Sequence, residues 1–346
     1  MVLEPEEHPS THRMYLCQAG QHGLSLIFAI FLDGAEAGAL PEIFEPGISS
    51  SAAHEASPAF SPDDNTMYFS RQNSAAGFIL VSHRSAGHWS KAGLASFSGT
   101  WEDSEPSMSP DGTILLFVSN RPLRSGGRPL DGRFQGQPHV GGGGNLWRVD
   151  RTPGGWSVPV LLPGIINRST TISSPAVASD GSLYFMDVAN RPPGHFQLFR
   201  SALKDGVYQA PEALPFSDGT FQDADLAIAP DESFAVFSSS RPPADHSLDV
   251  FIAFHGKSGW GKPLYLGNEV NVPGTTSNCE ARLGPDHWTL YFSSDRVLPV
   301  RLPLTPGQAQ LELQRMKTWN NSLYNIWRAD LSPWLDAPAS GGERAR

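Results

Sequence analysis

The chain has 346 residues and a net charge of −10, so wholesale binding of nucleic acid is disfavoured. Its two cysteines, Cys17 and Cys279, are too few for a disulfide framework, and Cys279 is expected to be buried packing rather than a nucleophile. Thirty-four glycines, thirty prolines and the near absence of long helical periodicity favour short strands joined by tight turns.

Residues 1–39 do not match the rest of the chain. The apolar run from Leu24 to Leu32 is too short to cross a bilayer comfortably, and Ala37-Gly38-Ala39 follows it. This order is typical of a secretory signal cleaved after Ala39, although Arg13 is the one firm positive charge before the run. We therefore expect a periplasmic or secreted protein with no transmembrane span in the mature chain. If residues 1–39 are an ordinary extension, the protein is expected in the cytoplasm.

Five related stretches follow, each with an aspartate in a tight turn between two apolar runs. One of them reads EPSMSPDGTILLFVSNRP, from Glu105 to Pro122. The five turn aspartates are Asp63, Asp111, Asp180, Asp231 and Asp286. Two β-prone runs around such a turn predict a hairpin, and recurrence at roughly 50-residue intervals predicts a repeat architecture.

A second hairpin is expected downstream of four of these turns. In each, a glycine-containing turn precedes one aromatic residue; the four aromatics are Trp89, Trp156, Tyr208 and Trp260. Two hairpins in each repeat make four strands, which is the composition of one blade of a β-propeller.

The fifth repeat ends after its third strand, and the missing fourth strand is expected at the other end of the chain. LPEIFEPGISSSAAHE (Leu40 to Glu55) parallels VPVLLPGIINRSTTIS (Val158 to Ser173). Residues Pro41 to Phe44 are therefore predicted to be the outer strand of the last blade, which would close the ring. The expected fold is an all-β propeller of five four-stranded blades over residues 40–335, with six blades as the alternative and 336–346 as a disordered tail.

The repeated SPDG turn, followed by an apolar strand and Phe-x-Ser-x-Arg, resembles the TolB-like propeller family over about Leu40 to Leu335. Asp180 lacks the preceding proline of this pattern and Asp286 the following glycine. The resemblance implies a β-propeller and often an exported location. It implies little about chemistry, because propellers include scaffolds, lectins and enzymes.

Alignment of the repeats on the turn aspartate places acidic residues in two columns. Six positions before the aspartate stand Ser57, Glu105, Ser174, Asp225 and Glu280, and eight positions before it stand Glu55, Asp103, Ile172, Asp223 and Asn278. Because side chains alternate along a strand, both columns are expected to face the central channel, as are Ala59, Ser107, Ala176, Ala227 and Arg282. Six carboxylates are thus predicted to meet at one mouth of the channel, with Arg282 just below. An ordinary structural role, in which each acid accepts hydrogen bonds from nearby amides, Ser or Arg, stays open.

Two long insertions, 123–144 and 297–322, both join second and third strands and should therefore lie on the same face as this mouth. Trp101 and Phe221 precede matching strands there. Carboxylates beside an exposed aromatic ring suit a sugar, whereas the alternative is that both rings pack beneath the loops. The predicted ligand-binding residues are Glu55, Trp101, Asp103, Glu105, Phe221, Asp223, Asp225, Glu280 and Arg282.

Two functions remain open from the sequence. The favoured one is an exported, monomeric binding module that recognises a protein or a glycan at the acidic mouth. The alternative is a glycan-processing enzyme, a glycoside hydrolase or polysaccharide lyase, with Glu105, Glu280, Asp103 and Asp225 as candidate catalytic residues. No nucleophile elbow, zinc motif, phosphate loop or dinucleotide fingerprint is present, and calcium is the one cofactor considered for the mouth.

Overall fold

The computed structural model describes residues 40–134, 137–188, 194–244, 247–272, 275 and 277–336. The predicted signal sequence at 1–39 lies outside these residues, as does the predicted tail beyond Asp336.

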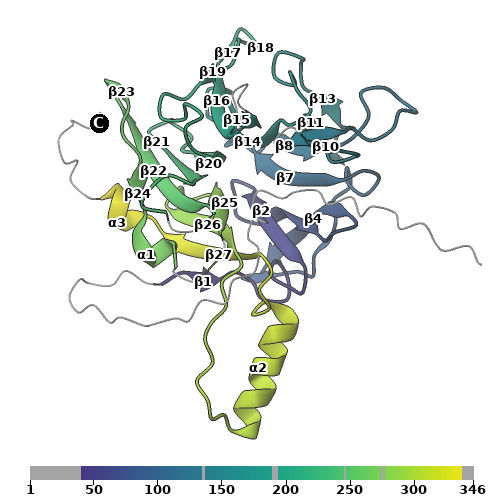
Figure 1. Cartoon of the computed structure of the whole chain (residues 1–346). Coiled ribbons are helices and arrows are strands. Elements are labelled where there is room, and N and C mark those ends of the chain that lie inside the picture. The colour runs from purple at the N-terminus through teal and green to yellow at the C-terminus, as the bar shows by residue number, and fades with distance from the viewer. Residues whose placement is uncertain are drawn as a thin grey trace, which may run out of the picture.

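The described residues form a five-bladed β-propeller, as predicted, with the innermost strand of each blade around the central axis (Figure 1).

Blade 1 contains β2 (His54–Phe60), β3 (Thr66–Gln72), β4 (Gly77–Ser85), β5 (His88–Trp89) and β6 (Gly93–Leu94). Blade 2 contains β7 (Asp103–Met108), β8 (Ile114–Ser119), β11 (Asn145–Thr152), β12 (Gly155–Trp156) and β13 (Val160–Leu161). Blade 3 contains β14 (Ser173–Val177), β15 (Leu183–Val188), β16 (Phe196–Ser201) and β19 (Glu212–Ala213), with the hairpin β17 (Leu203–Lys204) and β18 (Val207–Tyr208). Blade 4 contains β20 (Asp223–Ile228), β21 (Phe234–Ser239), β22 (Asp249–Gly256), β23 (Gly259–Trp260) and β24 (Leu264–Tyr265). Blade 5 contains β25 (Asn278–Leu283), β26 (Thr289–Ser294), β27 (Asn325–Asp330) and β1 (Glu42–Ile43).

The ring closes through the displaced strand that the sequence predicted. β1 pairs antiparallel with β27, with Glu42 opposite Arg328 and Ile43 opposite Trp327. The backbone N–H of Phe44 adds a 2.8 Å hydrogen bond to the carbonyl of Ile326. The last blade therefore takes its outer strand from the beginning of the described chain, which ties first and last blades together without an open sheet edge.

The turn aspartates close the inner hairpins by local hydrogen bonds. In every blade the aspartate side chain accepts the backbone N–H two residues further along the chain. The residue between them is left-handed in every case, with φ between 55° and 81°. Glycine adopts this conformation most easily, which explains Gly112 and Gly181 in the second and third turns.

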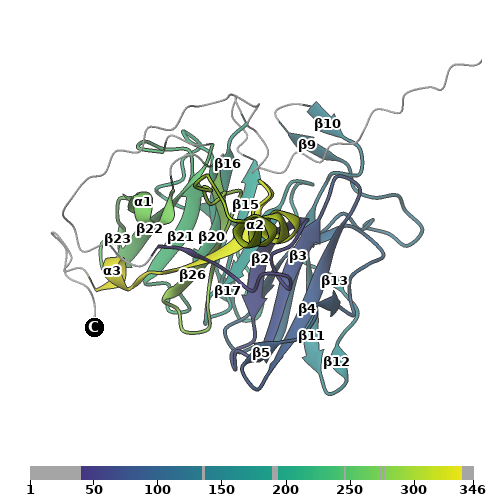
Figure 2. The same cartoon turned by 90° about the horizontal axis from the view of Figure 1, so that it is seen from below.

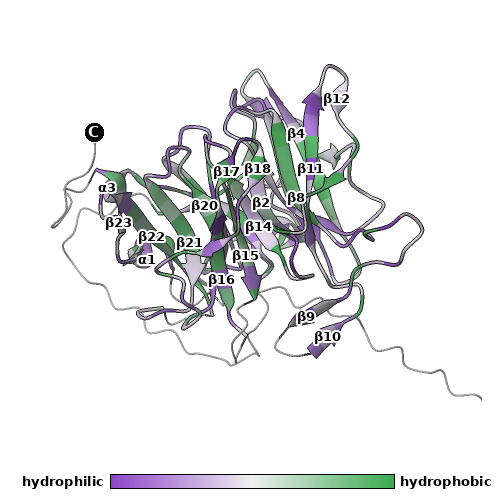
Figure 3. Ribbon diagram, turned by 90° about the horizontal axis from the view of Figure 1, so that it is seen from above, coloured by the Kyte–Doolittle hydropathy of each residue, from purple (hydrophilic) through white to green (hydrophobic). Residues whose placement is uncertain are grey.

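The apolar core lies between the blades and along their strands. Figure 3 shows hydrophobic residues concentrated on strands such as β8 and β21. The repeated aromatics of the outer hairpins pack against these clusters, and the indole N–H of Trp156 donates to the hydroxyl of Tyr68 in the neighbouring blade over 2.8 Å. Cys279 is fully buried among apolar side chains.

Both long insertions leave the ring between second and third strands. The first contains the hairpin β9 (Gly132–Phe134) and β10 (Gln137–His139), on the side of the molecule opposite the β5 and β12 hairpins (Figure 2). The second contains α2 (Pro306–Thr318), which begins with a capping box between Thr305 and Gln308 and buries none of its residues, so it projects from the blades (Figure 1).

Two short helices, α1 (Gly267–Val270) and α3 (Ser332–Leu335), complete the fold. Among the described residues no helix is long and apolar enough to cross a membrane.

Candidate functional site

Each innermost strand carries a β-bulge at the same place. The register of every inner pair shifts there, and the first residue of the bulge is left-handed although it is never glycine. These five residues are Ser57, Glu105, Ser174, Asp225 and Glu280, with φ between 49° and 55°. They form the predicted column six positions before the turn aspartate. A bulge breaks the alternation of side chains, so this column and the one two residues earlier need not point the same way.

The five bulge residues, together with Arg282, form a ring of polar contacts that we name the channel belt. The Ser174 backbone N–H donates to Glu105 Oε2 over 2.5 Å, and Ser174 Oγ lies 2.8 Å from Asp225 Oδ1. Asp225 Oδ2 accepts the Glu280 backbone N–H over 3.2 Å. The Ser57 hydroxyl donates to Glu280 across the closure of the ring.

The link between blades 1 and 2 is made differently. There, the backbone N–H of Glu105 donates to Ser70 Oγ, at the second strand of blade 1, over 2.8 Å. Inner strands of neighbouring blades are not paired in one sheet, so the belt supplies polar ties between them.

Three of the predicted carboxylates, Glu105, Asp225 and Glu280, thus meet in the channel. Burial raises the pKa of Glu280 to about 8; the carboxyls of Asp225 and Glu105 add to this, and the Ser57 hydroxyl and Arg282 oppose it. Burial also raises the pKa of Asp225, against hydrogen bonds from Ser174 and the Glu280 N–H and the charge of Arg282. At neutral pH, Glu280 is therefore mostly protonated.

Ser174 connects two carboxyls of the belt. Its Oγ lies 3.1 Å from Glu105 Oε2 and 2.8 Å from Asp225 Oδ1, so its hydroxyl proton is donated to one of them or shared between both.

The other three predicted carboxylates, Glu55, Asp103 and Asp223, bind arginines of their own blades. Glu55 accepts Arg71 Nε over 2.7 Å, Asp103 accepts Arg121 Nη2 over 3.2 Å, and Asp223 accepts Arg241 Nη2 over 2.6 Å. Burial raises the pKa of all three, and the paired arginine is among the groups that lower it.

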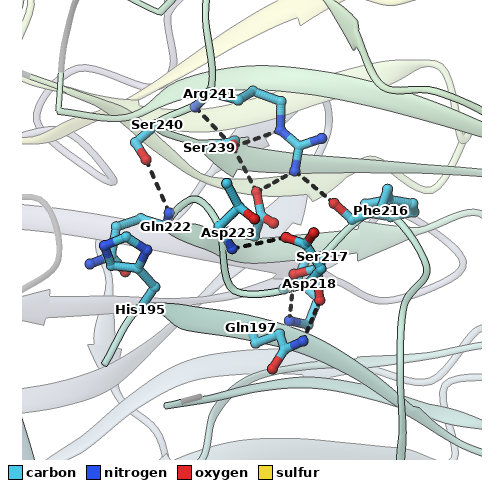
Figure 4. A network of polar contacts seen from close by, with 12 residues as sticks. His195, Gln197, Phe216, Ser217, Asp218, Gln222, Asp223, Ser239, Ser240 and Arg241 are labelled. Atoms are coloured by element: carbon cyan, nitrogen blue, oxygen red, sulfur yellow. Dashed lines mark hydrogen bonds and ion pairs between the residues drawn. The ribbon is translucent and has the colours of Figure 1, made fainter. Parts of the chain in front are cut away.

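Figure 4 shows the arrangement in blade 4. Arg241 reaches Asp223, Ser239 Oγ and the carbonyl of Phe216, and the Ser239 hydroxyl also donates to Asp223 over 2.6 Å. Asp223 is 1% exposed, so this pair fixes the loop after the second strand against the start of the first.

The expectation that all six carboxylates share one orientation is therefore wrong. The bulge separates the two columns: the later one joins the channel belt, and the earlier one forms ion pairs inside each blade. For Glu55, Asp103 and Asp223, the structural role that the sequence left open accounts for the ion pairs of the carboxylate.

Arg282 contacts the belt and also lines a cavity. Its Nη2 donates to Ser57 Oγ over 3.2 Å, and the side chain is 5% exposed. The cavity has a volume of about 310 Å³. All five residues predicted to continue the channel line it: Ala59, Ser107, Ala176, Ala227 and Arg282.

The two predicted aromatics differ in their surroundings. The ring of Phe221 lies against the guanidinium of Arg241, with 5.6 Å from Cζ to the ring centroid, so it supports the ion pair of blade 4. Trp101 is partly exposed at the start of blade 2. Phe221 is partly exposed as well, so exposure does not distinguish the two rings.

No group of three or more His, Cys, Asp or Glu side chains within the described ranges is arranged to hold a metal ion. The belt places three carboxyls near one another, but Ser174, Ser57 and the Glu280 N–H already bond to them. These contacts describe a hydrogen-bonded cluster of carboxyls and hydroxyls.

The predicted site list omitted two members of the belt, Ser57 and Ser174. The signal was present, since both stand in the same alignment column as Glu105, Asp225 and Glu280. A search restricted to charged residues passes over them, although their hydroxyls link the carboxyls.

Comparison with known proteins shows propellers of different functions. No protein-family model and no curated protein matches the chain. A putative TolB from Agrobacterium tumefaciens is 13% identical over 70% of each chain, with a TM-score of 0.45. An alpha-L-arabinofuranosidase from Lactobacillus brevis is 11% identical over 80% of this chain and 90% of that one, with a TM-score of 0.49. A gluconolactonase from Xanthomonas campestris is 12% identical over 87% and 89%, with a TM-score of 0.43. Likenesses this distant carry no argument about function.

Proposed function

We propose that the protein is an exported binding module that recognises a protein or a glycan at the mouth of its central channel, on the face of the two insertions. The observation that best supports this is the convergence of Glu105, Asp225 and Glu280, from three blades, in the channel belt. Glu105 and Glu280 are partly exposed, so they can also contact a ligand.

The belt gathers three carboxyls from three blades. The hydroxyls of Ser57 and Ser174 donate to two of them, those of Glu280 and Asp225. Burial and, after it, the charges of Asp225 and Glu105 raise the pKa of Glu280. Groups held in an unfavourable state are typical of functional sites, which supports a role for the acids beyond closing the ring.

The test is binding by variants that keep the shape of the belt. Purified protein is applied to a glycan array, with and without calcium, and to a protein microarray. We expect a defined set of ligands that is lost in Glu105→Gln and Glu280→Gln and kept in Glu212→Gln, a change at an exposed carboxyl on the outer strand β19. Ligands that bind the two belt variants as well as the native protein would place recognition elsewhere.

The alternative, a glycan-processing enzyme, is favoured by one observation. Glycoside hydrolysis needs one carboxyl that keeps its proton at neutral pH beside another that is ionised. Glu280, with a pKa of about 8, meets the first requirement, and Glu105 is its candidate partner. Release of reducing ends from a panel of polysaccharides, lost in Glu280→Gln, would support catalysis; no release from any of them by the native protein would contradict it.

A further inference from the structure

Arg296 differs from its counterparts in the other blades. The sequence Ser-x-Arg follows the second strand in blades 2, 4 and 5, and the arginines are Arg121, Arg241 and Arg296. In all three, the backbone N–H of the arginine donates over 3.2 Å to the hydroxyl of the serine two residues earlier in the chain. The loop therefore has the same local conformation in each blade.

The stacking of the guanidinium is also the same. Arg121 lies over Trp147, Arg241 over Phe251 and Arg296 over Trp327, at 5.6, 5.8 and 5.1 Å from the ring centroids. These rings occupy equivalent positions on the third strand, two residues after its beginning. Arg296 is thus oriented by the same platform as the other two.

The hydrogen-bond partners, by contrast, are missing in blade 5. Arg121 Nη2 bonds to Asp103 and the Phe97 carbonyl, and Arg241 Nη2 bonds to Asp223 and the Phe216 carbonyl. Within the described part of the chain the guanidinium of Arg296 has no hydrogen bond and no carboxylate partner; its buried Nη1 is unsatisfied, as is Nη1 of Arg121.

The reason is a substitution at the carboxylate position. Asp103 faces Ser119, Asp223 faces Ser239 and Asn278 faces Ser294 in the strand registers, so Asn278 stands where blades 2 and 4 have aspartate.

The neutral amide of Asn278 bonds to other side chains. Its Nδ2 donates to Asp249 Oδ1 over 3.0 Å and to Thr275 Oγ1 over 3.2 Å. The carbonyl partner is also lost, because the short helix α1 replaces the loop that supplies Phe97 and Phe216 in the other blades.

The electrostatics agree with the contacts. Burial lowers the pKa of Arg121, and the charge of Asp103 opposes that effect. Burial also lowers the pKa of Arg296, but no carboxylate opposes it. An arginine held by stacking, with its partner position left neutral, is suited to receive an anion from outside the chain.

We propose that Arg296 is a receptor for the carboxylate group of an organic ligand, which supplies the negative charge that Asp103 and Asp223 supply to the arginines of their blades. The fork of the guanidinium binds a carboxylate through two parallel hydrogen bonds, and a carboxylate is the partner of the equivalent arginines, Arg121 and Arg241. This proposal does not depend on the function of the channel belt, because Arg296 is not a member of it.

The probe is sodium acetate, titrated against sodium chloride at equal ionic strength and pH 7, with sodium sulfate as the tetrahedral anion. The readout is Tm. For the native protein we expect a saturable rise in Tm of roughly 2 °C once acetate reaches about five times its Kd, with a smaller effect of sulfate.

Two variants identify the site. Arg296→Met removes the receptor and should abolish the acetate response. Asn278→Asp supplies an internal carboxylate at the position equivalent to Asp103 and Asp223 and should abolish the response as well, whatever its own Tm. Asp223→Asn is the matched control, because it recreates in blade 4 the arrangement of blade 5 and should gain a second acetate response.

An equal acetate response in the native protein and Arg296→Met overturns the proposal, and so does the lack of any response in the native protein. A response of Asn278→Asp equal to the native one contradicts the assigned position of the carboxylate. Sulfate also raises Tm without binding, so the part of its effect that is lost in Arg296→Met is the quantity to compare; if that part is as large as for acetate, the assigned ligand class is wrong.

Discussion

Glu280 is the residue whose neutralisation should change the pH dependence of stability most clearly. Its pKa is about 8 in the folded protein, against an ordinary value of 4.5. Between these values the folded state binds one proton more than the unfolded state, so stability falls as pH rises, by about 1.4 kcal/mol per pH unit. The contribution is fully present below pH 4.5 and is lost as pH rises through 8.

The magnitude at neutral pH follows from the same shift. From pH 4.5 to 7 the loss amounts to about 3 kcal/mol, an upper bound because Glu280 is partly exposed and shares its proton with neighbours. Glu280→Gln stays neutral, its amide oxygen can still accept from Ser57, and its NH2 can donate to the neighbouring carboxyls. At about 2 °C per kcal/mol, Tm at pH 7 should rise by up to about 6 °C.

The assay is Tm between pH 5 and 8 for the native protein, Glu280→Gln and the exposed control Glu212→Gln. The native protein and the control should lose stability along this range. Glu280→Gln should have a flatter profile that meets the native one near pH 5. Two results would refute a buried, protonated carboxyl at Glu280. One is a native Tm that rises toward pH 8; the other is a Glu280→Gln variant with the native pH slope and a lower Tm at pH 7. Either result would mean that Glu280 is ionised and hydrogen-bonded in the folded protein.

Three further predictions concern closure, the blade ion pairs and export. Deleting residues 1–39 should leave Tm unchanged, whereas deletion through Phe44 should lower it sharply, because β27 loses its partner; equal melting of both forms would contradict the closure. Asp223→Asn should destabilise the protein by about 3 kcal/mol in urea unfolding, because it leaves Arg241 buried without its carboxylate, and a change within error would show that the pair is dispensable. Mass spectrometry of the native protein should find an N-terminus at Leu40 or close to it, and intact residues 1–39 would exclude a cleaved signal.

The sequence by itself determined the propeller and its closure, because the signals are local and repeated. Each turn aspartate binds backbone two residues away, so a short stretch such as that around Asp111 specifies its hairpin without distant contacts. Five copies specify five blades. The parallel between the segment at Leu40 and the outer strand of blade 2 was enough to predict the strand that pairs with β27.

Which acids meet was decided only by the tertiary structure. Alternation along a strand predicts that Asp103 and Glu105 point the same way, but the bulge between β7 and β8 places them in different networks. Nothing in the local sequence announces this bulge, since Glu105 is not a glycine and yet is left-handed.

The bulge conformation is held by contacts from neighbouring blades: Ser70 Oγ on the backbone of Glu105, and Ser174 on its carboxyl. Those partners lie 35 and 69 residues away in the chain. The left-handed conformation of Glu105 is unfavourable for an isolated residue and is stabilised by partners far away in the chain. It therefore follows from the closed ring and cannot be derived from the sequence of its own strand.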